Sequence, residues 1–180
     1  MVNIKDDIET AASSILTTYG FANQIPLQIV ALAESIGLRV LFACFNNNNI
    51  FGAITTKQFS PTIYVNTNDN RQRQRFTVAH EIGHYLLHMK NKNIQEMVDM
   101  YRGNEHTRIE REANIFAAAL LMDEHQISHD YWVFTASANK VLSLGSIYDR
   151  TIVESLANKY DVSISAMQIR LDVLGLIRSV

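Results

Sequence analysis

Apolar and polar positions recur along the N-terminal part of the chain with the period of a helix. Between residues 3 and 19, apolar side chains return every three to four positions, which predicts an amphipathic helix that Gly20 ends. Pro26 suits the first turn of a second, shorter helix over residues 27–36, because its fixed φ matches a helix start. The chain is therefore expected to open with two helices.

Three apolar segments follow, over residues 38–45, 50–56 and 62–66. Their lengths and their β-branched and aromatic residues predict strands. The asparagine run at residues 46–49 predicts a turn between the first two, since Asn tolerates turn conformations. The simplest arrangement is a three-stranded sheet with antiparallel or mixed pairing.

From about residue 70 the pattern is mainly helical. Helices are expected over residues 76–89, 109–122, 124–134, 153–160 and 163–175, and the polar segment 91–106 is expected to be irregular or partly helical. The last two helices and their short turn have the form of a helix-turn-helix. The sequence therefore predicts an α+β fold with a main domain over 1–145 and a helical subdomain over 146–180 packed on it.

Composition places the chain among ordinary globular proteins. It has 180 residues, of which 47% are hydrophobic and 19% are charged. A chain of this length and composition can bury a stable hydrophobic core without covalent cross-links. Cys44 is the single cysteine, so a disulfide scaffold is excluded. A net charge of −2 argues against a strongly basic surface that would bind nucleic acid. No apolar stretch reaches the roughly 18 residues of a membrane span, and no signal peptide is evident, so a cytoplasmic protein is expected.

The strongest chemical signal is the motif His80-Glu81-Ile82-Gly83-His84, an H-E-x-x-H. On a helix, positions i and i+4 share a face, so both imidazoles can bind one metal ion. Glu81 can accept a proton from water at that metal. The alternative is a buried His–Glu hydrogen-bond pair without metal, but a metal ion satisfies all three groups at once. The motif therefore predicts a metal centre with Glu81 as the catalytic base.

A third protein ligand must come from elsewhere in the chain. The position six residues after His84 is Lys90, so a three-histidine zinc arrangement is excluded. The next strong helix offers Glu110 and Glu112, and spacing alone leaves both open. Asn114 could hydrogen-bond the ligating carboxylate. Whichever glutamate is not the ligand is expected to be a solvated acid favoured by the helix dipole.

Other polar residues near the motif have less defined roles. His88 lies one further turn along and is expected to be a supporting or surface histidine rather than a ligand. Four residues are candidates for stabilising an oxyanion in the transition state, and the sequence does not rank them: Tyr64, Tyr85, Tyr101 and His106.

Two stretches, Arg75–His88 and Glu110–Met122, resemble the ImmA/IrrE-type metallopeptidases. The helix-plus-strand pattern before them and the tail ending at Arg170–Gly175 also look similar, so the resemblance covers most of the chain. One departure is visible: members of this family usually have Pro after Leu-Leu-Met, where this chain has Asp123. Either residue suits the start of a helix.

The resemblance implies a small zincin-like fold with one zinc ion. The implied ligands are His80, His84 and a glutamate of the second helix, which the family's Glu-x-x-x-Asn pattern places at Glu110. Members typically cleave a helix-turn-helix repressor encoded beside them, which relieves repression of phage, mobile-element or stress genes. In zincins the substrate peptide lies along an edge strand. The candidate strand consists of Ile63, Tyr64, Val65 and Asn66.

The function expected on these grounds is a zinc-dependent endopeptidase acting on one regulatory protein. The alternative is a zinc-stabilised regulator that binds a repressor or DNA without cutting, but a purely structural zinc site has no need of Glu81. DNA binding by residues 146–180 is not expected, because Arg170 is the one cation between residues 163 and 175 and Asp172 offsets it. A protein substrate is therefore the expected partner, with no membrane.

Overall fold

The computed structural model describes residues 4–47, 49–57, 59–90, 94–100, 107–139 and 145–177. The chain forms two compact units, Met1–Leu121 and Met122–Val180. The boundary expected from the sequence lay later, between residues 145 and 146. No helix within the described residues is both long and apolar enough to cross a membrane.

The first unit is built on a four-stranded mixed sheet. Its strands, in the spatial order β1-β3-β2-β4, are β1 (Arg39–Ala43), β2 (Ile50–Thr55), β3 (Thr62–Asn66) and β4 (Glu96–Met100). β1 and β3 are parallel, whereas β2 is antiparallel to both β3 and β4. The α+β class is confirmed, and the pairing is the mixed one of the two alternatives.

The fourth strand corrects the expected three-stranded sheet. β4 lies in the polar segment 91–106, for which the prediction of irregular or partly helical structure is wrong over Glu96–Met100. β4 joins β2 through backbone hydrogen bonds, and an edge strand commonly carries charged side chains. Glu96 is one of these and forms an exposed ion pair with Lys57. Hydrophobic periodicity is therefore a poor signal for such a strand.

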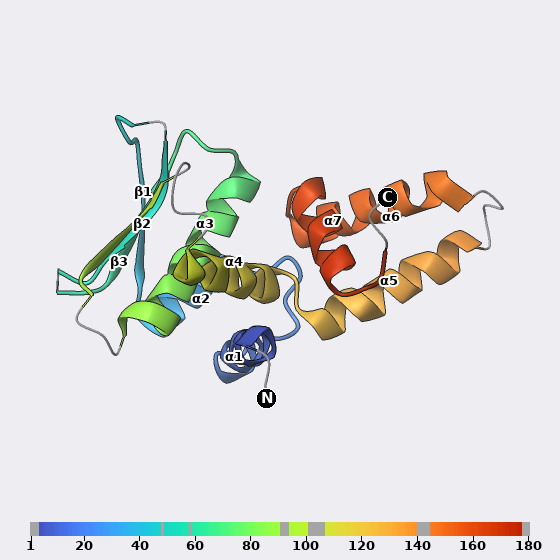
Figure 1. Ribbon diagram of the computed structural model, residues 1–180, viewed down its shortest axis with the longest axis horizontal. Coiled ribbons are helices and arrows are strands. Elements are labelled where there is room, and N and C mark those ends of the chain that lie inside the picture. The colour runs from blue at the N-terminus through green and yellow to red at the C-terminus, as the bar shows by residue number, and fades with distance from the viewer. Residues whose placement is uncertain are drawn as a thin grey trace. The chain divides into compact units, whose positions relative to one another are not determined.

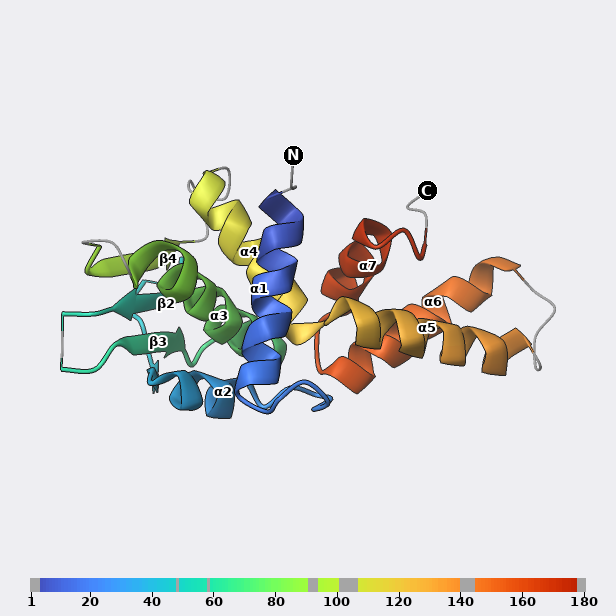
Figure 2. The same cartoon turned by 90° about the horizontal axis from the view of Figure 1, so that it is seen from below.

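Helices cover one face of this sheet (Figures 1 and 2). The helices of this unit are α1 (Ile4–Thr18), α2 (Ile29–Ile36), α3 (Arg71–Gly83) and α4 (Arg108–Leu121). α3 lies across β2 and β3, α2 contacts β1 and α3, α4 packs on α3, and α1 packs on α4. The core between these layers includes Leu16, Leu32, Ile54, Ile63, Val65, Val78, Ile82, Phe116 and Leu120. The interior of the unit therefore surrounds α3.

α3 has a defined start and an unusual end. Asn70 caps it, since its Oδ1 accepts a hydrogen bond from the backbone N–H of Arg73 at 2.9 Å. At its end the helix widens into a π-helical segment, η1 (His84–Met89), and the N–H of Lys90 donates to the carbonyl five residues back at 2.8 Å. The sequence predicts one continuous helix over 76–89. The observed helix starts five residues earlier and changes its winding at the second motif histidine.

The second unit consists of α5 (Glu124–Asn139), α6 (Gly145–Tyr160) and α7 (Ile164–Val173). The Tyr160 hydroxyl donates to Asp130 at 2.7 Å, and Lys159 forms an ion pair with the same carboxylate oxygen at 2.6 Å. Arg170 is 3% exposed and donates from Nε to the carbonyl of Met122 at 2.9 Å. These polar contacts join α5 to α6 and anchor α7 to the residue that opens the unit.

Candidate metal centre

The residues of the H-E-x-x-H motif lie in the buried part of the sheet-covering helix. His80 and Glu81 are in α3 and His84 begins η1, with exposed fractions of 2%, 0% and 1%. The two histidines are four residues apart and share a face, so their ring centroids are 4.4 Å apart. The local helix alone therefore brings the two imidazoles together.

Two glycines allow neighbouring elements to approach this helix closely. A Cβ atom on Gly83 would lie 3.2 Å from Cδ1 of Phe116, so α4 packs directly against the backbone of α3. A Cβ atom on Gly52 would lie 3.1 Å from Oε1 of Glu81 and would overlap the side chain of Thr77. The backbone of β2 is therefore the surface against which the Glu81 carboxylate rests.

The packing of α4 on α3 brings Glu110 to the two histidines. Nε2 of His80 and Nε2 of His84 are 2.8 Å apart. Oε2 of Glu110 lies 3.2 Å from the first of these nitrogens and 3.4 Å from the second. Within the part of the chain that the structure describes, these are the three His, Cys, Asp or Glu side chains that lie close enough to share a metal ion.

The three atoms fit a tetrahedral metal ion. Ligand atoms held about 2.0–2.1 Å from a tetrahedral zinc ion are about 3.3 Å from one another. The two His–Glu separations are close to this value and the His–His separation of 2.8 Å is somewhat shorter. Two imidazole nitrogens and one carboxylate oxygen form a donor set typical of catalytic zinc. The residues present therefore suit a divalent metal of this kind.

Asn114 determines which nitrogen of His80 carries the proton. Its Oδ1 lies 3.0 Å from Nδ1 of His80, and an amide oxygen can only accept, so Nδ1 is the donor. A ring that carries its proton on Nδ1 alone has its lone pair on Nε2, the atom that faces His84 and Glu110. Asn114 thus contacts a histidine, whereas the sequence analysis predicted a hydrogen bond to the ligating carboxylate.

The two glutamates near the start of α4 have different surroundings. Burial acts to raise the pKa of the Glu110 carboxyl, but hydrogen bonds and charge from His80 and His84 outweigh it and lower the pKa to about 2. Glu112 instead accepts a hydrogen bond from Nε of Arg108 at 2.6 Å, and its side chain is 16% exposed. The structure therefore brings Glu110 to His80 and His84, whereas Glu112 lies beside Arg108 and its Oε2 is 3.9 Å from Nε2 of His88.

The prediction that the substrate peptide lies along an edge strand formed by residues 63–66 is wrong. The four residues concerned, Ile63, Tyr64, Val65 and Asn66, lie in β3. β3 pairs with β1 on one side and β2 on the other, so both of its edges are already hydrogen-bonded. Sequence order placed this strand just before the motif helix, but the spatial order of strands depends on long-range pairing.

His88 has a contact that the sequence did not indicate. It is 3% exposed, and its Nε2 lies 3.1 Å from the backbone carbonyl oxygen of Ile109, the residue before Glu110. In the sequence, the spacing of four residues between His84 and His88 is the feature that could have indicated this contact.

Of the oxyanion candidates, Tyr64 and Tyr85 are half-buried, whereas Tyr101 and His106 lie outside the described residues.

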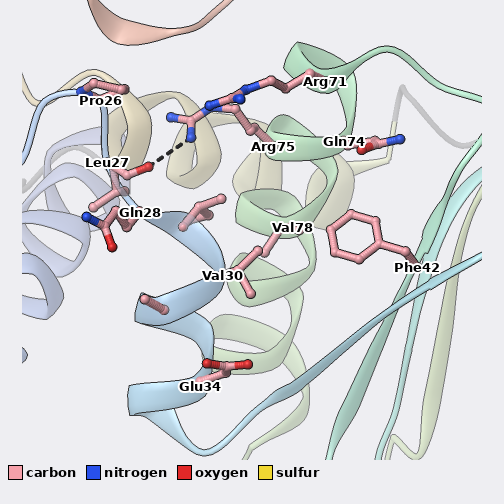
Figure 3. A pocket seen from close by; sticks show the side chains of 12 residues that line it. Pro26, Leu27, Gln28, Val30, Glu34, Phe42, Arg71, Gln74, Arg75 and Val78 are labelled. Atoms are coloured by element: carbon pink, nitrogen blue, oxygen red, sulfur yellow. Dashed lines mark hydrogen bonds between the residues drawn. The ribbon is translucent and has the colours of Figure 1, made fainter.

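A cavity of about 530 Å³ lies apart from this cluster, between α2 and the first half of α3 (Figure 3). Arg75 lines it and donates from Nη1 to the carbonyl of Leu27 at 2.9 Å. Val78 also lines it and lies two residues before His80, about 200° away around the helix. The cavity therefore opens on the opposite side of α3 from the proposed ligands.

The sequence profile described as the IrrE N-terminal-like domain, a peptidase family, matches residues 33–172. This match covers well over half of the chain and includes every residue of the cluster. It confirms the resemblance expected from the two helix motifs.

Curated relatives match over shorter stretches. The radiation response metalloprotease IrrE of Deinococcus radiodurans is 40% identical over 67 residues, which are 37% of this chain and 20% of that protein. The metallopeptidase ImmA of Bacillus subtilis is 33% identical over 64 residues, 36% of this chain and 37% of the relative. The IrrE protein of Deinococcus deserti is 43% identical over 61 residues, 33% of this chain and 22% of the relative. The chain thus spans between a fifth and about two fifths of the length of these relatives.

Proposed function

This chain belongs to the peptidase family of the IrrE N-terminal-like domain, and on that premise we propose that it is a zinc-dependent endopeptidase that cleaves one regulatory protein. The observation that carries the proposal is the buried triangle of His80 Nε2, His84 Nε2 and Glu110 Oε2, with sides of 2.8–3.4 Å. Two of these residues flank a buried glutamate in the motif, which a purely structural metal site does not require. Names of the partly matching relatives, metalloprotease and metallopeptidase, support the same activity.

The proposed ligands are His80, His84 and Glu110. When bound there, zinc supplies Lewis acidity, which polarises the scissile carbonyl and makes water a better nucleophile. Asn114 holds His80 so that its Nε2 faces the site, and Glu110 supplies a carboxylate oxygen beside it. The chain thus offers two imidazole nitrogens and one carboxylate oxygen as ligands.

Glu81 is the proposed general base. It takes a proton from the attacking water and later delivers it to the leaving amine. Its position next to His80 in α3 and the backbone of β2 against its carboxylate limit where that carboxylate can move. Glu81 is fully buried, so proton transfer takes place in surroundings that exclude bulk water.

A substrate peptide needs an open sheet edge, and we assign it to β4. Within the described residues β4 ends the sheet and pairs with β2 on its other side. β2 carries Gly52, which faces Glu81, whereas β1 lies beyond β3. An extended peptide added to β4 would therefore lie on the side of the sheet nearer the base.

The proposed substrate is a helix-turn-helix repressor encoded beside this protein, as the family resemblance implies. The second unit is proposed to pack or to grip that substrate, not DNA. Arg170 supports this view because it is buried against Met122 and so offers no charge to a phosphate.

The deciding experiment incubates the zinc-loaded chain with the repressor encoded by the neighbouring gene and follows it by gel electrophoresis and mass spectrometry. We expect one specific cut, which disappears with a metal chelator or with Glu81→Gln. Glu34→Gln, at an exposed glutamate of α2, is the matched control and should cut at the wild-type rate. A repressor that binds the zinc-loaded chain and stays intact would refute the peptidase and support the non-cleaving regulator.

A further inference from the structure

His88 connects the end of the motif helix to the beginning of α4. Its Nε2 is 3.1 Å from the carbonyl oxygen of Ile109, and since a carbonyl can only accept, the ring donates this hydrogen bond. The ring is 3% exposed, so water cannot replace the contact cheaply. His88 therefore holds a backbone atom one residue away from Glu110.

A second cross-link lies on the other side of Glu110. His80 Nδ1 donates to Oδ1 of Asn114 at 3.0 Å, and Asn114 is four residues after Glu110. The two imidazole contacts, at Ile109 and Asn114, thus flank Glu110 along α4. With both made, the first turn of α4 can neither slide along α3 nor rotate away from it without breaking one of these two hydrogen bonds.

The geometry of η1 is part of this arrangement. The helix changes from α to π winding at His84, and π segments redirect the side chains that follow them. His88 lies in this segment, with its ring centroid 5.5 Å from that of His84. The ring reaches α4 at the turn from which Glu110 extends, and not at the metal-facing atoms of the cluster.

We infer that His88 is a positioning residue, which fixes the first turn of α4 so that the Glu110 carboxylate stays within 3.2–3.4 Å of the two histidine nitrogens. This inference rests on the proposed metal centre and adds a residue to it. His88 acts through the backbone of Ile109 and does not touch the metal. Its removal should therefore weaken metal binding without removing any ligand.

The test measures the zinc dissociation constant of the purified full chain by competition with a chromophoric chelator. His88→Leu, which fills the site without a donor, should bind zinc about 10–100-fold more weakly, the usual effect of losing a partner that orients a ligand. His88→Gln, whose side-chain N–H can reach the same carbonyl, should recover most of the affinity. His125→Leu, at an exposed histidine of α5, is the matched control and should bind as the wild type.

A second readout separates positioning from general stability. Co²⁺ loaded in place of zinc gives visible bands whose intensity depends on coordination number, and His88→Leu should change them while the circular dichroism of the folded chain stays the same. If His88→Leu does not fold, His88→Asn, an amide too short to reach Ile109, must show the same loss of affinity. Wild-type zinc affinity and cobalt spectrum in a folded Leu or Asn variant would overturn the inference.

The result also distinguishes this inference from the proposed function. A wild-type chain that binds zinc but cleaves nothing refutes the endopeptidase, and the role of His88 is then decided by zinc affinity alone. A wild-type chain that takes up no zinc overturns the metal centre and the inference together.

Discussion

Replacing Gly52 with alanine is the sharpest test of how β2 and the motif helix fit together. The added Cβ atom would lie 3.0 Å from the carbonyl oxygen of Tyr64 and 3.1 Å from Oε1 of Glu81, and it would overlap Cγ2 of Thr77. Non-bonded carbon atoms settle at about 3.5–4.0 Å, so β2 or α3 must move. Because Thr77 and Glu81 are one helical turn apart on the same face, a shift that relieves one contact also displaces the other.

The magnitude follows from overpacking of a dense core. Inserting a methyl group into such a site costs about 1–3 kcal/mol. At about 3 °C per kcal/mol for a chain of this size, the melting temperature should fall by roughly 3–9 °C. Zinc affinity should stay unchanged, since no proposed ligand contacts Gly52, whereas cleavage should slow because Glu81 is displaced.

Thr77→Ser provides the internal control, since it removes Cγ2, the atom with the worst overlap. The assay is thermal unfolding of the metal-free chain for the wild type, both single variants and the double variant. The double variant should be more stable than the sum of the two single effects predicts. Additive effects, or a Gly52→Ala variant that melts with the wild type, would show that β2 does not press on α3 in this way.

The remaining predictions concern metal, base, ligand choice and nucleic acid. The purified wild-type chain should contain one zinc ion by atomic emission and His80→Ala should lose most of it; a chain that takes up none on titration excludes the centre. Glu81→Gln should keep zinc and fold but lose nearly all cleavage, because an amide cannot accept the proton; cleavage at the wild-type rate would remove Glu81 from the mechanism. Glu110→Ala should weaken zinc binding far more than Glu112→Ala in parallel titrations, and the reverse order would move the ligand to Glu112. In fluorescence anisotropy the chain should not bind operator duplex at submicromolar concentration, because the one cation of residues 163–175 is buried; tight, salt-dependent binding would favour the regulator.

Local spacing was sufficient for the part of the site that lies on one helix. His80 and His84 are one turn apart, and any helix over this segment places their rings together. Ligand choice between Glu110 and Glu112 could not be settled in the same way. It depends on how α4 is rotated about its axis, and that rotation is set by packing of Phe116 against Gly83.

Strand order and helix winding show the same division between local and long-range causes. The apolar segments of β1, β2 and β3 were visible in the sequence, but β4 is held by backbone pairing with β2 and has no apolar period of its own. The position of β3 inside the sheet follows from its parallel pairing with β1 across the chain. The π winding of η1 and the contact of His88 with α4 are likewise not visible in the hydrophobic periodicity of the sequence.

The division of the chain after Leu121 has a consequence for how such a protein can diversify. Every group assigned to metal binding, proton transfer or ligand support, from His80 to Asn114, lies before that boundary. Within the described residues, the contacts of Tyr160 with Asp130 and of Arg170 with Met122 both join residues of the second unit. If the second unit grips the substrate, as proposed, that part of recognition is encoded in a separate stretch of the gene that follows the one for the metal centre. A lineage could then exchange the second stretch and acquire a new target while the residues of the metal centre are inherited unchanged.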